Sequence, residues 1–143
     1  MKKKNNWKIL SVLGISVLIL SSCGGGHKFK STYSGDVTDK KGSPVKGVTI
    51  YAISNEKADS NLMHALTREE MALFKGEKNL TSSFGDKTDT SGKFSLSVEL
   101  ENLSSTPNMY LLFKKSGYKS VLLNMDTGTH VNTEVKLDSV GGK

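Results

Sequence analysis

Hydrophobic and polar residues alternate along several stretches of the chain, and turn residues separate these stretches. In residues 93–100, four apolar side chains alternate with polar ones, which predicts a strand with one buried and one wet face. Further strands are predicted over residues 33–38, 45–54, 83–88, 118–124 and 131–137. Residues 109–114 carry the continuous run YLLF, which predicts a central strand covered on both faces.

Turn sequences lie between most of these predicted strands. Residues 39–44 read DKKGSP and residues 89–92 read DTSG. In both, Asp can accept backbone hydrogen bonds and Gly can supply a positive φ. Seven short strands joined by such turns predict an all-β fold, namely a seven-stranded antiparallel β-sandwich.

Residues 55–82 interrupt the β pattern and predict a short helical insertion. Leu62, Leu66, Met71 and Phe74 recur at helical spacings, and residues 67–70 read TREE, a capping box. We expect a helix over residues 68–75 that ends near Gly76. The apolar face either packs over an open end of the sheet or binds a partner. In the second interpretation, the four apolar residues are the candidate partner contacts.

The N-terminus has the plan of a secretory signal. Four lysines precede an apolar stretch over residues 9–20, and small residues then precede Cys23. The stretch is shorter than the about 20 residues that cross a bilayer. The segment resembles a bacterial lipoprotein signal, in which a peptidase cuts before the cysteine and the thiol receives diacylglycerol. Cys23 is therefore the candidate lipidation site; an ordinary cleaved signal with an incidental cysteine is the alternative.

These patterns divide the chain into four parts. We expect a signal peptide over 1–22, a flexible tether over 23–31, the sandwich over 32–138 and a frayed tail over 139–143. Cys23 is the only cysteine, so no disulfide forms within one chain. The net charge of +6 falls to +2 without the four leader lysines. The remaining basic residues do not cluster, so we expect no nucleic-acid partner.

Three sequence blocks resemble the carboxypeptidase regulatory-like domains, also called transthyretin-like or prealbumin-like domains. Residues 35–48 read GDVTDKKGSPVKGV, residues 88–94 read TDTSGKF, and residues 112–118 read LFKKSGY. The blocks follow the order of the family. The resemblance implies a transthyretin-like, immunoglobulin-like sandwich, and lipoproteins of this kind resemble products of the Bacteroidota. The long 55–82 insertion departs from the family pattern.

No catalytic, metal-binding or cofactor-binding group is predicted. Hydroxyisourate hydrolases, which share the transthyretin-like fold, use histidines, an arginine and a Tyr-Arg-Gly-Ser terminus that this chain lacks. His27, His64 and His130 lie far apart in the sequence and have no zinc-ligand spacing. We therefore expect a protein that is not an enzyme and needs no cofactor.

The sequence predicts a membrane-anchored lipoprotein that acts as a non-catalytic binding or assembly module in the cell envelope. Its partners would be the membrane, through the lipid, and a protein of the envelope or of a secretion complex. Recognition of a glycan or another extracellular ligand is the alternative. Gly24 after the cysteine favours the outer membrane, and the absence of acidic residues there favours a periplasm-facing domain.

Overall fold

The computed structural model describes residues 26–55, 60–75, 80–125 and 130–141 of the 143-residue chain. The predicted signal peptide and Cys23 lie outside these ranges. Within them, no helix has the length and apolar content needed to cross a membrane. The elements are β1 (His27–Asp39), β2 (Thr49–Ser54), α1 (Ser60–Ala65), α2 (Arg68–Leu73), β3 (Thr81–Lys87), β4 (Lys93–Leu103), β5 (Met109–Lys114), β6 (Val121–Met125) and β7 (His130–Leu137).

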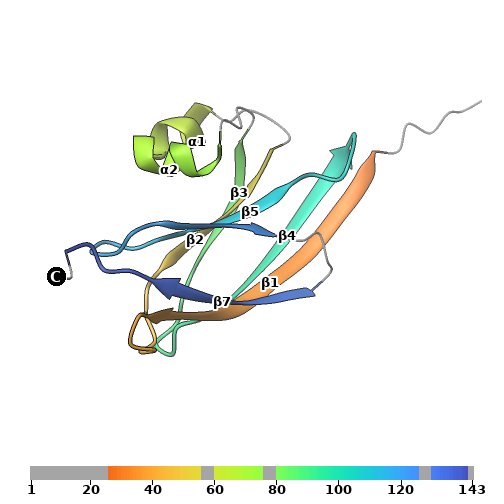
Figure 1. Ribbon diagram of the computed structural model, residues 1–143. Coiled ribbons are helices and arrows are strands. Elements are labelled where there is room, and N and C mark those ends of the chain that lie inside the picture. The colour runs from red at the N-terminus through yellow and green to blue at the C-terminus, as the bar shows by residue number, and fades with distance from the viewer. Residues whose placement is uncertain (1–25, 56–59, 76–79, 126–129, 142–143) are drawn as a thin grey trace, which may run out of the picture.

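The strands form two sheets that pack as a sandwich (Figure 1). One sheet has three strands in the order β4-β1-β7, and the other has four in the order β3-β2-β5-β6. The predicted seven-stranded sandwich is confirmed. Its strands are not all antiparallel, however, because β1 and β7 pair in parallel. Alternation predicts which face of a strand is buried, but it carries no information about the direction of a neighbour so distant in sequence.

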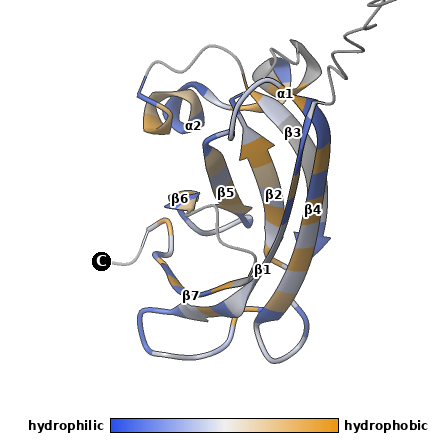
Figure 2. Cartoon of the chain, turned by 90° about the vertical axis from the view of Figure 1, so that its right-hand side faces the viewer, coloured by the Kyte–Doolittle hydropathy of each residue, from blue (hydrophilic) through white to orange (hydrophobic). Residues whose placement is uncertain are grey.

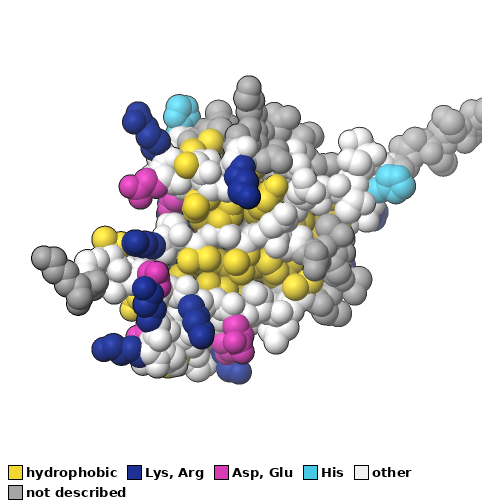
Figure 3. Space-filling model, in the orientation of Figure 1, with side chains coloured by type: hydrophobic (Ala, Val, Ile, Leu, Met, Phe, Trp, Pro, Cys, Tyr) yellow, Lys and Arg dark blue, Asp and Glu magenta, His cyan; other side chains and the backbone are white. Residues whose placement is uncertain are grey.

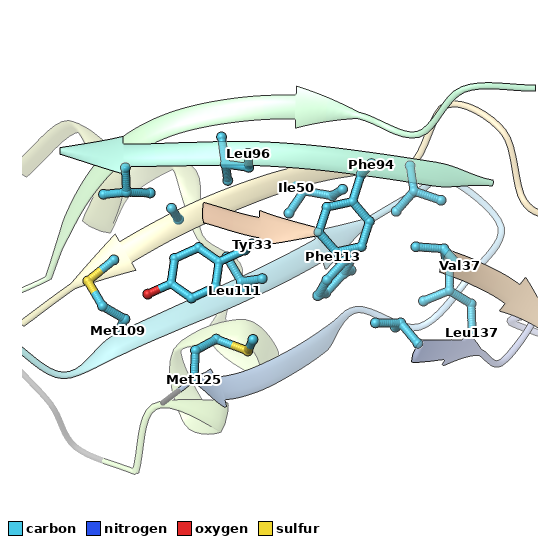
Figure 4. Packing of buried hydrophobic residues seen from close by; sticks show 14 of the residues in the cluster. Tyr33, Val37, Ile50, Phe94, Leu96, Met109, Leu111, Phe113, Met125 and Leu137 are labelled. Carbon is cyan, nitrogen blue, oxygen red and sulfur yellow. The ribbon is translucent and has the colours of Figure 1, made fainter. Parts of the chain in front are cut away.

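The core lies between the sheets and is built from the inward-facing residues of both. Hydropathy alternates along β4 as the sequence pattern requires (Figure 2). Figure 4 shows Tyr33, Ile50, Phe94, Leu111 and Phe113 converging from both sheets. The rings of Phe94 and Phe113 meet edge to face at 5.5 Å between centroids, a favourable arrangement for aromatic pairs.

The predicted tether over 23–31 is wrong from His27 onward, because these residues form the first part of β1. Phe29 pairs with Leu100 of β4, and Ser31 is fully buried. Serine at an inward position hides the alternation that would otherwise have predicted this strand. The predicted frayed tail is also held in part, since Val140 donates its amide to the Gly117 carbonyl at 2.8 Å.

Both predicted Asp-x-x-Gly turns are present. Asp39 Oδ1 accepts the amides of Lys41 and Ser43 at 2.8 and 2.9 Å. Asp89 Oδ1 accepts the amides of Ser91 and Lys93 at 2.8 and 2.9 Å. These contacts support the interpretation of both aspartates as turn-forming residues.

Buried Thr88 connects the start of the second turn to the chain before β2. Its hydroxyl donates to the Val45 carbonyl at 2.6 Å and accepts the Val48 amide at 3.0 Å. This threonine thereby satisfies the Val45 carbonyl and the Val48 amide, which lie outside the paired strand. They lie outside it because β2 begins at Thr49 and not at residue 45 as predicted. Other strands also differ from their predicted bounds: β3 covers Thr81–Lys87, β4 continues to Leu103, β6 covers only Val121–Met125 and β7 begins at His130.

Candidate functional site

The helical insertion covers the outer face of the four-stranded sheet (Figure 1). Leu62 of α1 and Phe74, which caps α2, pack with Ile53 and Leu112 in a second apolar cluster outside the main core. In β5, Leu111 faces the main core while Leu112 faces this cluster. The prediction that β5 is covered on both faces is therefore confirmed, and the insertion covers a face of the sheet, not its open end.

The structure separates the four predicted partner contacts. Leu62 and Phe74 are only 7% and 2% exposed, so their side chains belong to the domain interior and offer no docking surface in this arrangement. Leu66 and Met71 are partly exposed. Leu73 lies in the same apolar stretch but is not one of the four predicted contacts, and it is 41% exposed.

Helix α2 begins with the predicted capping box, which the structure confirms. The Glu70 amide donates to Thr67 Oγ1 at 3.2 Å, and the Thr67 amide donates to Glu70 Oε2 at 2.9 Å. Lys75, after the helix, has a left-handed φ of 51°. The predicted terminator, Gly76, lies outside the described residues.

Glu70 also connects the insertion to the sheet. Its carboxylate accepts Lys114 Nζ at 2.9 Å and Ser120 Oγ at 2.8 Å, and the residue is 4% exposed. Burial alone would raise the pKa of Glu70, but the hydrogen bonds from Thr67, Lys114 and Ser120 outweigh it and hold the pKa below its ordinary value. Glu70 is thus a buried, ionised residue that joins α2 to β5 and to the segment before β6.

Three hollows lie around this connection. The α2 groove, about 610 Å³, is lined by Thr67, Glu69, Glu70, Leu73, Tyr118, Lys119, Ser120 and Val140. The β6 hollow, about 330 Å³, is lined by Leu73, Phe74, Lys75, Tyr110, Leu122 and Asn124. The lysine pocket, about 550 Å³, is lined by Gly47, Thr49, Tyr51, Lys114, Lys115, Ser116 and Ser120. Leu73 joins the first two hollows, and Ser120 lies between the α2 groove and the lysine pocket.

Strand β6 is an uncharged sheet edge beside two of these hollows. The four edge strands of the described sheets are β3, β4, β6 and β7, and only β6 has no charged residue within its bounds. Sheet edges commonly carry charges that prevent pairing with another chain. Figure 3 shows two apolar bands across the middle of this face, where β6 runs in Figure 1. Leu73 and Val140 are the large hydrophobic residues most exposed in the described part of the chain.

The described residues hold no group of three or more His, Cys, Asp or Glu side chains placed to bind a metal ion. The one histidine of the insertion, His64, is exposed on α1. The three hollows are lined by apolar side chains, lysine side chains, hydroxyls and the Glu69 and Glu70 carboxylates.

No protein-family model and no curated protein matches this chain. Among solved structures, it is similar to 3-chlorocatechol 1,2-dioxygenase from Rhodococcus opacus, with 14% identity, a TM-score of 0.48, and coverage of 80% of this chain and 62% of that one. A dioxygenase domain from Streptomyces sp. SirexAA-E gives 15% identity, a TM-score of 0.45, and coverage of 85% and 86%. The shaft pilin SpaA from Lactobacillus rhamnosus GG gives 12% identity, a TM-score of 0.43, and coverage of 79% and 52%.

These similarities concern the β-sandwich alone. The chain spans 62%, 57% and 53% of the length of the first three dioxygenase structures. Sequence identity is 15% or less in each similarity named above, and fold does not imply function. The protein is therefore described by its fold: a small two-sheet β-sandwich with a helical insertion on one face.

Proposed function

We propose that this protein is a lipid-anchored, non-catalytic binding module of the cell envelope, and that its sandwich belongs to the carboxypeptidase regulatory-like type. The pattern of residues 1–23 supports a lipid on Cys23. Placement on the periplasmic side of the outer membrane is part of the proposal. The partner is a protein of the envelope, such as a component of a secretion complex.

The observation that carries the binding proposal is the uncharged β6 edge with Leu73 beside it. An added strand gains main-chain hydrogen bonds from an open edge, and pockets beside the edge select its alternate side chains. The β6 hollow lies beside Leu122 and Asn124 and offers such a pocket. The partner is thus expected to present an extended segment with an apolar side chain that enters this hollow.

The connection through Glu70 makes this surface rigid. It holds α2, and with it Leu73, at a fixed position against β5 and the residues before β6. A preformed surface loses less conformational entropy on binding than one that must be ordered first. The insertion therefore acts mainly as a support for the β6 edge, with Leu73 as its contact residue.

The binding proposal is tested by site-specific photo-crosslinking from position 124 in the native host. Asn124 is exposed, so a photoreactive side chain fits there. One discrete protein adduct is expected, and Leu73→Asp should abolish it. Leu66→Asp should weaken it less, because Leu66 packs against the second cluster. A crosslinker at exposed Ser95 of β4 is the control and should give no such adduct.

Failure to obtain an adduct at position 124, or an adduct that Leu73→Asp leaves unchanged, would contradict a β6 binding site. The anchor is tested separately by the mass of the mature N-terminal peptide. A diacylglycerol-modified Cys23 supports the proposal, and Cys23→Ala should release the folded domain from the membrane. An unmodified cysteine in the mature protein would contradict the anchor.

Recognition of a glycan is a second candidate function. The observation that favours it is the lysine pocket, which combines two ammonium groups, three hydroxyls and the half-buried ring of Tyr51.

A further inference from the structure

The lysine pocket lies on the same outer sheet face as the insertion and meets the α2 groove at Ser120. Its floor is β2 and β5, where Thr49 pairs with Lys114 and Tyr51 with Leu112. Its wall is the turn after β5, which contributes Lys115 and Ser116. The pocket measures about 550 Å³, within the usual range for small-molecule sites.

Two lysines, Lys114 and Lys115, line this pocket, and a third, Lys87, lies on the neighbouring strand beside Thr49. Lys87 of β3 and Lys114 of β5 are both cross-strand partners of Thr49, so their side chains leave the same face of the sheet in one row. The Lys115 ammonium lies over Gly47, 3.6 Å from where a Cβ would be. Lys87 and Lys115 take part in none of the ion pairs formed among the described residues.

Asp86 Oδ1 accepts the backbone amide of Lys87 at 2.7 Å. Among the described residues, Glu70 is the one carboxylate that forms an ion pair with these lysines. It pairs with Lys114 and is 4% exposed. Its Oε2 accepts the Thr67 amide and Lys114 Nζ, while its Oε1 accepts the Ser120 hydroxyl. Glu70 therefore neutralises Lys114 in part and fixes its position, but it presents no free oxygen to the pocket. The ammonium groups of Lys115 and Lys87 remain to attract an anion.

Tyr51 adds an aromatic surface beside these charges. Its cross-strand partner in β3 is Gly85, and a Cβ there would lie 3.9 Å from Cε1 of the Tyr51 ring. The absence of a side chain at Gly85 leaves one side of the ring open. An aromatic ring packs well against the C–H face of a sugar, while the hydroxyls of Thr49, Ser116 and Ser120 match sugar hydroxyls.

We propose that the lysine pocket binds a sugar that carries an acidic group. The acidic group lies between Lys115 and Lys87, and the ring of the sugar lies against Tyr51. A simple anion would use the lysines alone, and a neutral sugar would use Tyr51 and the hydroxyls alone. The arrangement favours one ligand that has both features. This proposal rests on the second candidate function, recognition of a glycan at the same pocket, and names its ligand class. It is independent of the β6 edge and of the anchor, since it uses different residues.

Calorimetric titration of the full chain in detergent micelles tests the proposal with four probes: glucuronate, glucose 6-phosphate, glucose and inorganic phosphate. Both acidic sugars should bind, and each should bind up to about five-fold more tightly than glucose, the factor expected from about one exposed ionic contact. Each should also bind more tightly than phosphate, which has no sugar ring to place against Tyr51. The ratio between glucuronate and glucose 6-phosphate distinguishes a carboxylate-bearing from a phosphate-bearing ligand.

Lys115→Gln should weaken binding of the acidic sugars about five-fold, and Lys87→Gln should weaken it similarly. Lys41→Gln removes an exposed lysine that does not line the pocket and is the matched control. Unchanged thermal unfolding of these surface variants shows that the fold is intact. No binding by either acidic sugar, equal binding of glucose or phosphate, or an unaffected Lys115→Gln variant would each overturn the proposal. Loss of binding in the Lys41→Gln control would overturn it as well, because charge alone would then explain the affinity.

Discussion

The Glu70 carboxylate and the Lys114 ammonium form an ion pair at 2.9 Å across 44 positions of sequence. The pair joins the helical insertion to a central strand, and its side chains are 5% and 29% exposed. Glu70 also completes the capping box of α2. One side chain thus starts the helix and attaches it to the sheet, which fixes the positions of both the α2 groove and the lysine pocket.

Replacing Glu70 with glutamine should destabilise the domain by about 1–3 kcal/mol, the cost of weakening charge-assisted hydrogen bonds at a buried site. The free energy of unfolding in urea measures this change. Glu69→Gln, at the exposed neighbouring position, is the matched control and should stay within about 0.5 kcal/mol of the native chain. Equal effects of the two substitutions would show that Glu70 does not hold the insertion to the sheet.

Acid should loosen the insertion, because Glu70 is ionised in the folded chain. Its folded pKa is lower than that of the unfolded chain. Its contribution to stability is therefore complete above the unfolded pKa and is lost as the pH falls through the lowered, folded pKa. Lys114, Ser120 and Thr67 face the carboxylate and make this difference. The protection of the α2 amides against hydrogen exchange, taken relative to the intrinsic exchange rate at each pH, should fall below the ordinary carboxyl range.

The Glu70→Gln variant provides the control for this pH effect. Hydrogen bonds from the Lys93 amide and the Ser91 side chain also lower the pKa of Asp89, so acid affects more than one site. Only the component that disappears in Glu70→Gln belongs to the insertion. If native chain and variant show the same pH dependence of exchange in α2, Glu70 is not the group that titrates.

The sequence predicted features that depend on local pattern. The capping box at Thr67 and Glu70, the two aspartate turns and the doubly covered strand β5 all follow from residues close together in the chain. The partners Lys114 and Ser120 could not be predicted, because they meet Glu70 only after the insertion folds back onto the sheet. Pairing between distant segments is set by the whole topology and leaves no periodic signal.

Two inward positions of the first strand carry no apolar side chain, and one of them, Ser31, explains why the strand was predicted too short. Ser31 and Gly35 occupy the buried side of β1, where the alternation rule expects apolar residues. Glycine is required at 35, since a Cβ there would lie 1.9 Å from the Thr133 carbonyl oxygen of the neighbouring β7. The close approach of these two strands thus removes an apolar marker from the sequence pattern.

Replacing Tyr33 with phenylalanine should stabilise the domain by about 1 kcal/mol, because it removes a polar group from the core. The residue is fully buried, and its hydroxyl oxygen points toward Met109 (Figure 4). Burial raises the pKa of Tyr33, and the nearby Ser31 side chain partly offsets this rise. In the described part of the chain, the Tyr33 hydroxyl has no hydrogen-bond partner of good geometry. Urea unfolding measures the change. Tyr118→Phe, at a half-buried position, is the control, and a loss of stability in Tyr33→Phe would mean that the hydroxyl is hydrogen-bonded after all.

The two glycine turns should respond differently to alanine, although their backbones are alike. Gly42 and Gly92 have φ values of 82° and 77°. At Gly42 nothing lies within 4 Å of an added Cβ, so Gly42→Ala should cost only the left-handed backbone penalty, about 1 kcal/mol. At Gly92 the Cβ would lie 2.5 Å from the Val37 carbonyl oxygen. The turn must then move away from β1 and strain the hydrogen bond from the Val37 amide to the Gly92 carbonyl. Gly92→Ala should therefore cost about 2–4 kcal/mol in urea unfolding, and equal costs at the two glycines would show that the contact with Val37 does not constrain this turn.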